Sequence, residues 1–389
     1  MRSLKATVEP IILSMSQTDQ PIVEPHGSGS YSSGPALNHA LQVSPEISPK
    51  AAEFHRHQTE VNAAAPEPRA SPKVSVLVPT YNYARYLPEA IESVLEQDFQ
   101  DYEVVIVDDC SQDDSEAVIR RYAARDSRIR CCFNRPNLGM VANWNYCLSL
   151  AKGEYIQFLF GDDKLADRQA LSKMVGLLDG NQSAVLAVAA RNIIDDNSEV
   201  IEVSSHLGAS GLHIGFEVIV RCLEKNANIV GEPSVVMMRR HDALRGFNLE
   251  YRQLPDLEMW FHLLEKGNAI YTAEPLYSFR RHALQQTAVN RISQTGERES
   301  VFLLAEYYAR PWLRNWKSRK LLFAQIYALQ KGNAFGETAK ELEDRLMKSL
   351  GETWYFWFWF MRKLERPFSN LKRFYFKHIL RRTVKREHS

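Results

Sequence analysis

Hydrophobic positions between residues 73 and 190 follow two patterns that alternate along the chain. Short apolar runs rich in valine, isoleucine and aromatic residues have the length and composition of buried strands. Between them, apolar residues recur at the spacing of one helix face. These patterns predict strands at residues 74–78, 102–107, 129–133, 155–160 and 184–190, and helices at 86–97, 115–124, 140–151 and 169–178. Strands that alternate with helices form βαβ units, so we predict an α/β protein with a mostly parallel sheet flanked by helices.

Beyond residue 190 the elements are less regular. The expected features are a polar surface crossing at Ser198–His213, a helix at 216–224, a strand at 233–240, short strands at 269–272 and 276–279, and helical structure from about Glu297. Asp256 is expected to open a further helix, which Gly267 would close as its C-cap.

Composition divides the chain into three regions. Residues 1–72 are rich in small and polar residues and show no hydrophobic period, so we predict a disordered N-terminal segment. Residues 73–290 form the predicted α/β domain, and residues 291–389 form a helical C-terminal region. With 45% hydrophobic and 24% charged residues the chain has the composition of a globular protein. Its net charge of +1 gives no general attraction for nucleic acid.

Cysteine usage and hydropathy indicate the cellular compartment. The five cysteines have neither metal-ligand nor disulfide spacing, which is typical of reduced thiols in a cytoplasmic protein. No apolar run reaches the ~20 residues that a membrane-spanning helix needs. Glu9 and Pro10 precede a very short apolar run, which makes a poor signal peptide. We therefore expect a cytoplasmic protein.

Two predicted strands end in adjacent aspartates, Asp108–Asp109 and Asp162–Asp163. Ligands of open α/β sheets bind beyond the carboxyl ends of the strands, so carboxylates there are well placed for chemistry. Adjacent carboxylates repel each other, and their hard oxygens suit Mg²⁺ or Mn²⁺ that carries a substrate phosphate. Taken alone, the second stretch favours a solvated turn, whereas the motifs around it favour the chemistry.

Six motifs occur in order between about Lys73 and Thr287: V-S-V-L-V-P-T-Y-N, E-V-V-I-V-D-D-C-S, N-L-G, A-K-G-E-Y-I-Q-F-L-F-G-D-D, L-P-D-L-E-M-W and F-R-R-H. Together they resemble the family 2 glycosyltransferases, inverting enzymes of the GT-A fold with a Rossmann-like sheet. The resemblance implies transfer of a sugar from a nucleotide-sugar, here a UDP-sugar, to a hydroxyl acceptor, with Mn²⁺ or Mg²⁺ as cofactor. The acceptor would be a glycan or a lipid-linked saccharide of polysaccharide biosynthesis.

The resemblance assigns the donor pocket to the ends of the first two strands. Pro79, Thr80 and Tyr81 would line it, with Tyr81 against the base, because an aromatic face gives a planar base a dry surface to pack on. Asp109 would accept a hydrogen bond from the uracil ring. The alternatives are a tyrosine that anchors the loop and an aspartate that caps the following helix.

The resemblance assigns the metal site to Asp163 and His282. Phe160 replaces the first aspartate of the family's D-x-D motif, leaving F-G-D-D. Asp163 would be the direct metal ligand, and Asp162 would contact the ribose or the metal. The imidazole of His282 would ligate the metal or contact the diphosphate, unless it is an ordinary surface histidine. Arg281, or alternatively Arg280, would offset charge on the leaving phosphates.

Asp256 matches the family's general base. In an inverting transfer the acceptor hydroxyl loses its proton as it attacks the sugar, and a carboxylate on the acceptor side can take that proton. At a predicted helix start, the helix dipole would favour the ionised, basic form. A plain N-cap is the alternative, and Pro255 stands where the family more often has glutamate.

Two other functions fit parts of the pattern. A nucleotidyltransferase would normally carry a Gly-rich basic loop after the first strand, where this chain has T-Y-N-Y-A-R. The missing first aspartate would fit a catalytically inactive nucleotide-sugar-binding protein, although Asp163, Asp256 and His282 argue against it. Acceptor contacts are expected from Ser198–His213 and Gly231–Ser234.

The C-terminal region combines aromatic and basic residues. Trp354–Met361 is apolar and mostly aromatic, but at ~1.5 Å per residue it covers only ~12 Å, less than the ~30 Å core of a bilayer. In Leu371–Lys385 the apolar residues fall on one helix face among basic ones, which is an interfacial pattern. We expect a peripheral contact with anionic membrane at the inner face of the plasma membrane. Packing of these aromatics on the protein itself is the alternative.

Overall fold

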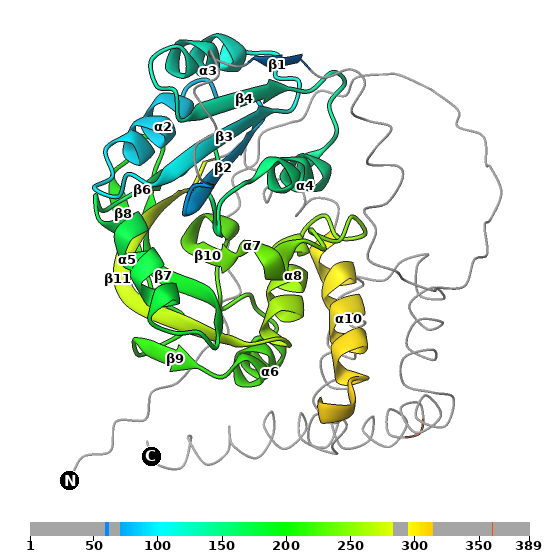
Figure 1. Ribbon diagram of the computed structural model, residues 1–389. Helices are drawn as coiled ribbons and strands as arrows, with labels where there is room; N and C mark the ends of the chain where they lie inside the picture. Colours follow the sequence, from blue (N-terminus) through cyan, green and yellow to red (C-terminus); the bar gives the residue numbers. More distant parts are fainter. Residues whose placement is uncertain (1–58, 62–70, 283–294, 314–359, 361–389) are drawn as a thin grey trace, which may run out of the picture. The chain divides into compact units, whose positions relative to one another are not determined.

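The computed structural model describes residues 59–61, 71–282, 295–313 and Phe360 of the 389-residue chain (Figure 1). The predicted disordered segment lies mostly outside these residues, and so do the predicted aromatic and basic membrane-surface segments except for Phe360. Within the described parts, none of the helices has the length and hydrophobicity that a membrane crossing requires.

One mixed sheet contains the strands of the described chain. Its order is β1-β4-β3-β2-β5-β10-β7-β11-β6, with β8 paired to β7 and β9 to β11. The strands are β1 (Thr59–Val61), β2 (Val74–Thr80), β3 (Tyr102–Asp108), β4 (Ile129–Phe133), β5 (Tyr155–Phe158), β6 (Lys164–Leu165), β7 (Ala184–Ile194), β8 (Val200–Ser204), β9 (Gly211–His213), β10 (Val236–Arg239) and β11 (Asn268–Arg280). Strands β4, β3, β2 and β5 are parallel, whereas β10 runs antiparallel to β5 and β7. The predicted α/β class is confirmed, and the main strands are mostly parallel as predicted, because β11 also runs parallel to β7 and β10 alone is reversed between β5 and β7.

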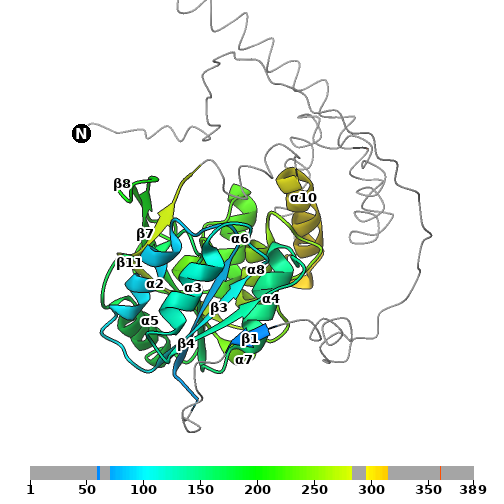
Figure 2. The same ribbon diagram turned by 90° about the horizontal axis from the view of Figure 1, so that it is seen from above.

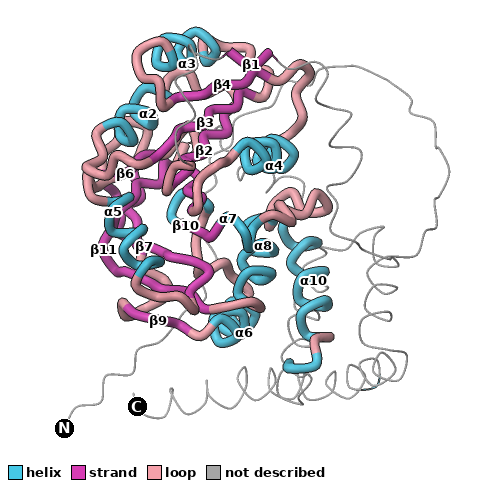
Figure 3. The backbone as a smooth tube through the Cα atoms, in the orientation of Figure 1, coloured by secondary structure: helices cyan, strands magenta, loops and turns pink. Residues whose placement is uncertain are grey.

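Helices cover both faces of this sheet. They are α2 (Leu87–Leu95), α3 (Ser115–Ala123), α4 (Met140–Leu150), α5 (Ala170–Asp179), α6 (Gly215–Lys225), α7 (Arg240–Ala243), α8 (Pro255–Leu264) and α10 (Thr295–Tyr308), with 3-10 turns η2 (Pro233–Val235) and η3 (Pro311–Leu313). Helices α2, α3 and α5 lie on one side of the sheet, and α4, α6, α7 and α8 lie on the other (Figures 1 and 3).

Strand β1 lies within the segment that was predicted to be disordered, so the prediction is wrong at its three residues. It pairs antiparallel with β4 at the end of the sheet. An edge strand offers unpaired backbone N–H and C=O groups, and a short segment can pair with them without a hydrophobic period of its own.

Strand β2 continues through Pro79, where the sequence pattern predicted a stop. The strand pairs with β3 as far as Thr80, but its pairing with β5 ends at Leu77. Pro79 therefore lies beyond the last β5 pair, and its missing N–H group leaves no ladder bond unmade on that side.

Strand β11 is continuous where two short strands were predicted. Its register against β7 shifts between Thr272 and Pro275 and again before Tyr277, so bulges accommodate the interruption of the hydrophobic pattern. The polar stretch Ser198–His213 also differs from its prediction, because it contains β8 and β9. Both strands pair at the margins of the sheet, where a strand keeps exposed side chains.

Gly267 has a packing role in place of the predicted C-cap role. Helix α8 ends at Leu264, and its C-cap residue Glu265 keeps a right-handed helical conformation. A Cβ atom on Gly267 would lie 2.5 Å from Val185 Cγ1 and 2.8 Å from the Ser183 carbonyl oxygen. Glycine is needed there because the turn after α8 passes closely over the start of β7.

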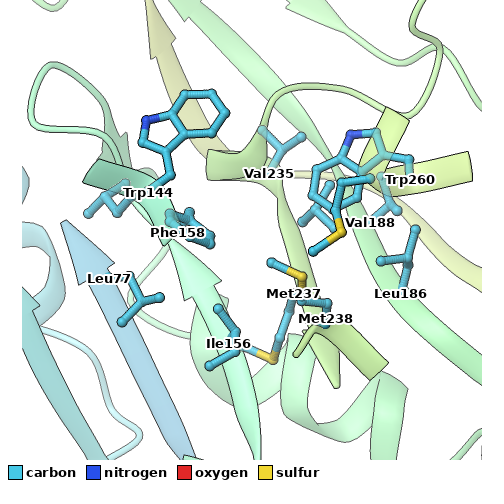
Figure 4. Close-up of a cluster of buried hydrophobic side chains, with 14 of the residues drawn as sticks. Leu77, Trp144, Ile156, Phe158, Leu186, Val188, Val235, Met237, Met238 and Trp260 are labelled. Carbon is cyan, nitrogen blue, oxygen red and sulfur yellow. The ribbon is translucent and has the colours of Figure 1, made fainter. Parts of the chain in front are cut away.

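Aliphatic side chains and methionines, together with the aromatic residues Trp144, Phe158 and Trp260, form a buried cluster at the middle of the sheet (Figure 4). The Trp144 ring of α4 packs on Phe158 of β5 and on Phe247, with ring centroids 6.4 and 5.2 Å apart. Tilted and T-shaped aromatic pairs stabilise by roughly 0.5–1.5 kcal/mol each beyond the area they bury. The loop around Phe247 is thereby fixed to the centre of the sheet.

Helix α10 packs on the α/β domain although it lies past the predicted boundary at residue 290. Tyr307 contacts Phe261 of α8, and Trp312 contacts Phe216 of α6, each with ring centroids 4.8 Å apart. Figure 2 shows α10 on the same side of the molecule as α4, α6 and α8. The described part of the C-terminal region thus belongs to the packing around α8.

Candidate active site

The predicted site residues gather at one edge of the sheet, where β2, β3 and β5 end. Thr80 and Asp108 are register partners at the ends of β2 and β3, and Asp162 and Asp163 follow β5 after a short turn. Parallel strands place their carboxyl ends at the same edge, which explains why residues from separate motifs meet there. The end of β11 reaches this edge too, since the Arg280 backbone N–H donates to Asp163 Oδ1 at 3.0 Å.

The β2 end combines a buried threonine with an exposed tyrosine. Pro79 and Thr80 are buried, and the Thr80 hydroxyl has no hydrogen-bond partner within the described chain. Gly161 passes so close that a Cβ atom on it would lie 2.7 Å from that hydroxyl oxygen. Tyr81 leaves 46% of its surface exposed, so its ring is available to a flat ligand and does not form the core of the loop.

Asp109 holds the loop that leads into α4. Its Oδ1 accepts hydrogen bonds from Asn134 Nδ2 at 2.9 Å and from the Leu138 backbone N–H at 2.7 Å. Its Oδ2 accepts one from the Gly139 N–H at 2.9 Å. The alternative of a cap for the following helix is wrong, because the three donors belong to the segment before α4 and not to α3. Three of the roughly four lone-pair sites of the carboxylate are thus used by the chain itself.

Asp163 is enclosed by the protein. Ser234 Oγ donates to its Oδ2 at 2.6 Å, and the Arg280 N–H donates to its Oδ1. Burial and the neighbouring Asp162 carboxylate raise the pKa of Asp163 well above its ordinary value. Each oxygen therefore has one protein partner and keeps a lone-pair site, and the role of Asp163 as direct metal ligand stays a prediction.

Asp162 is the aspartate that meets His282. The two side chains are buried, and Asp162 Oδ2 lies 3.0 Å from His282 Nε2. Burial and the neighbouring Asp162 charge raise the pKa of the Tyr83 hydroxyl above its ordinary value, so it stays protonated and able to donate. The His282 ring lies between Tyr83 and Tyr86, with ring centroids 5.8 and 5.2 Å away. His282 is therefore not a surface histidine.

A divalent cation fits this pair as a site of two protein ligands. A carboxylate oxygen and an imidazole nitrogen, from Asp162 and His282, suit Mn²⁺ in particular. Within the described residues, no three histidine, cysteine or acidic side chains form a group that could hold a metal by themselves. A cation here would depend on oxygens of a bound substrate to complete its coordination.

The two arginines after β11 point in opposite directions. Arg280 is buried and donates from Nε to the Asp162 carbonyl oxygen at 2.8 Å. Arg281 keeps 54% of its side chain exposed and lies 3.4 Å from Glu202 Oε2. Successive side chains of an extended segment alternate in direction, so Arg281 points away when Arg280 and His282 face the aspartates. The phosphate contact of Arg281 stays a prediction.

Asp256 lies in the first turn of α8, one residue after Pro255. Its Oδ2 accepts a hydrogen bond from Asn228 Nδ2 at 2.8 Å, and its Oδ1 accepts one from the Leu257 N–H at 2.8 Å. Burial raises the pKa of Asp256 to about 7, and the charge of Glu232 acts in the same direction. Burial outweighs the helix dipole, so the predicted preference for the ionised form is wrong. The same shift makes the carboxylate a stronger base near neutral pH.

A loop at residues 228–234 connects Asp256 with the aspartates after β5. Asn228 bonds to Asp256 at one end of it, and Ser234 bonds to Asp163 at the other. In between, the Gly231 carbonyl oxygen accepts from Trp260 Nε1 at 2.9 Å. Asn228 was not predicted for the site, and Ser234 was predicted only as part of the acceptor segment Gly231–Ser234. Neither residue has a sequence signal of its own, because both are common polar loop residues.

The chain is similar to known glycosyltransferases. The model of the family described as Glycosyl transferase family 2 matches residues 75–245. EpsE of Bacillus subtilis, which is named as a glycosyltransferase, is 30% identical over 220 residues, or 54% of this chain and 74% of EpsE. A Campylobacter jejuni protein named GalNAc(5)-diNAcBac-PP-undecaprenol beta-1,3-glucosyltransferase is 41% identical over 95 residues, or 24% of this chain and 31% of that protein.

The fold is similar to that of a solved glycosyltransferase-fold structure, S. aureus TarS 1-349 in complex with UDP-GlcNAc. The TM-score is 0.52 at 18% sequence identity, and the match covers 72% of this chain and 80% of TarS 1-349. Both structures have a large sheet with flanking helices. The predicted GT-A architecture is therefore confirmed.

Proposed function

Because the chain belongs to glycosyl transferase family 2, we propose that it is an inverting enzyme that moves a sugar from a UDP-sugar to a hydroxyl acceptor. The observation that carries this proposal is the loop 228–234, which joins the aspartates after β5 to Asp256. A direct displacement needs a fixed donor and a base on the acceptor side, and the loop ties the two places together.

We place the nucleotide at the ends of β2 and β3. The exposed ring of Tyr81 packs on the base, with Pro79 and Thr80 beneath it. Asp109 keeps one lone-pair site on Oδ2, which accepts the N–H of uracil while the other sites hold the 137–139 loop. The UDP-GlcNAc complex of TarS, a protein of similar fold, supports UDP as the nucleotide.

We assign the divalent cation to Asp162 and His282, with Asp163 as the residue that fixes the turn beneath them. When bound, Mn²⁺ or Mg²⁺ neutralises charge on the diphosphate leaving group. The chain orients this pair through Tyr83, which is able to donate to Asp162, and through Ser234, which holds Asp163 in place.

Asp256 takes the proton of the acceptor hydroxyl. Asn228 fixes the orientation of its carboxylate, and burial sets its pKa near the pH of the cytoplasm. The Gly231–Ser234 segment borders the base and is the place where we expect the acceptor to bind.

The acceptor is a glycan or a lipid-linked saccharide. The undecaprenol in the name of the Campylobacter jejuni relative supports a lipid-linked one. Such an acceptor would agree with the predicted peripheral contact of the C-terminal aromatic and basic segments with anionic membrane.

Removal of either proposed metal ligand should abolish the metal dependence of UDP binding. We expect wild type to bind UDP more tightly with Mn²⁺ than without it, because Asp162 and His282 would hold a cation that neutralises charge on the diphosphate. In Asp162→Ala and His282→Ala the two affinities should become equal. Isothermal titration of UDP with Mn²⁺ and with a chelator measures both values.

Arg281→Ala is the matched control for this titration. It removes a charge from the residue next to His282 that points toward Glu202, so the metal dependence should remain as in wild type. Equal UDP affinity of the wild type with and without metal would contradict the metal site.

Transfer should slow as the pH falls through about 7. The base acts only when it is ionised, and the raised pKa of Asp256 means that its protonated form prevails below that pH. Below the pKa the rate should fall about tenfold per pH unit, and above it the rate should level off. The test is a profile of kcat/KM for the acceptor, measured from about pH 5 to about pH 9 in steps of about one pH unit. A rate that stays level down to about pH 5 would contradict the role of burial, because an ordinary aspartate titrates at about pH 4.

A further inference from the structure

A glutamate of the C-terminal helix holds the turn that precedes Asp256. Glu299 of α10 is buried, and its carboxylate accepts three backbone hydrogen bonds from consecutive residues. The Arg252 N–H donates to Oε1 at 2.7 Å, and the N–H groups of Gln253 and Leu254 donate to Oε2 at 2.7 and 2.8 Å. Each of these hydrogen bonds is charge-assisted, because the acceptor is a carboxylate. It is therefore stronger than a hydrogen bond between neutral groups.

These bonds add to a local cap at the start of α8, in which Asp256 Oδ1 accepts from the Leu257 N–H. The first N–H groups at a helix start have no partner within the helix, and a side chain at the N-cap position usually accepts one of them. In α8 the N-cap residue is Leu254, which has no side chain able to do so, and Pro255 follows it. The Glu299 carboxylate binds the N–H of Leu254 itself and places a negative charge at the positive end of the helix.

The capped turn lies directly before the proposed base. Asp256 follows Leu254 by two residues, so the backbone that Glu299 fixes also sets the direction of the Asp256 side chain. The carboxylate of Asp256 is fixed as well, because Asn228 Nδ2 donates a hydrogen bond to Asp256 Oδ2 at 2.8 Å. Helix α10 is itself held against α8 by the Phe261–Tyr307 contact, so the position of Glu299 is rigid.

We propose that Glu299 is a positioning residue for the general base, and that the described part of the C-terminal region thereby completes the active site. This inference rests on the proposed role of Asp256. Both residues lie after residue 245, where the match to the family model ends. The part of the chain that the family model covers would then be insufficient for transfer, although it carries the donor pocket.

Glu299→Gln tests the inference, with Glu306→Gln as its control. The glutamine keeps the length of the side chain, but its amide nitrogen cannot accept a hydrogen bond. The 252–254 turn therefore loses part of its hydrogen bonding to residue 299. We expect kcat to fall by about 10- to 100-fold, because a displacement of about 1 Å at a catalytic group can cost about 10²-fold. The KM for the donor and the affinity for UDP should be unchanged. Glu306, exposed on the same helix and paired with Arg310, should tolerate the same change without effect.

A double-mutant cycle separates positioning from a general effect on the fold. If Glu299 acts through Asp256, the Glu299→Gln change should cost little in an Asp256→Asn background. Full additivity of the two losses would overturn the inference, and so would an unchanged kcat. A joint loss of kcat and UDP affinity would also overturn it, since the effect would then be on the fold. Wild-type turnover in Asp256→Asn alone would reject the base assignment first, and the inference with it.

Discussion

Replacement of Asp256 with asparagine is expected to lower kcat for sugar transfer by about 10²–10⁴-fold, the range that general-base catalysis contributes. Asparagine has the shape of aspartate and can accept from the Leu257 N–H, but it cannot take a proton from the acceptor. Donor affinity should be nearly unchanged, because Asp256 lies at the far end of the 228–234 loop from the proposed metal pair. Steady-state transfer rates and UDP titration, on the same preparations, measure the two effects separately.

A second acid-to-amide variant controls for loss of charge alone. Asp167 forms a surface ion pair with Lys173 at 2.7 Å, and Asp167→Asn should leave kcat as in wild type. Wild-type turnover in Asp256→Asn would remove this residue from the mechanism. If the wild-type protein itself releases no UDP from any UDP-sugar in the presence of Mn²⁺, the inactive nucleotide-sugar-binding alternative is the better description.

Strands and helices with a regular local pattern could be predicted closely from the sequence. The strand at Ile129–Phe133 has the predicted bounds, and α4 differs by one residue at its end, because hydrophobic periodicity is a local property. The antiparallel course of β10 could not be predicted in this way, since the direction of a strand depends on its partners, β5 and β7. The continuity of β11 past Pro275 likewise depends on bulges against β7.

The sequence predicted which residues gather at the site, but not the role of each residue. Asp162, Asp163 and His282 do come together, because the motifs that carry them end at one edge of the sheet. Adjacent aspartates look alike in a sequence, and only the tertiary partners Ser234 and Arg280 distinguish the enclosed one from the one that meets the histidine. Successive side chains alternate in direction along the extended segment at the end of β11. Only this geometry shows that Arg280, and not Arg281, faces the aspartates.

Glu299 could not be predicted for a related reason. Its partners are backbone N–H groups, which are present at nearly every residue and so give no complementary side-chain signal. The spacing of 45 residues between Leu254 and Glu299 also puts the pair beyond any local pattern. Contacts of this kind become visible only when the packing of α10 on α8 is known.

Replacement of Arg280 with methionine is expected to lower the free energy of unfolding by about 1–3 kcal/mol, the cost of leaving buried acceptors without their donor. The Arg280 guanidinium pairs with the carboxylate of Glu89. Its other described acceptors are the carbonyl oxygen of Asp162 at 2.8 Å, that of Asp195 at 2.9 Å and Ser198 Oγ at 2.9 Å. Methionine occupies much of the same space but donates to none of them, so buried acceptors would lose their partner.

Arg281→Met is the matched control, because it makes the same chemical change at the next residue. The Arg281 side chain is half exposed and lies 3.4 Å from Glu202, an arrangement that contributes little to stability. We expect its free energy of unfolding to stay within about 0.5 kcal/mol of the wild type. Urea unfolding with an unchanged m-value measures both variants. Equal losses in the two would mean that burial of the guanidinium does not decide the outcome, and that Arg280 does not hold the aspartate turn in place.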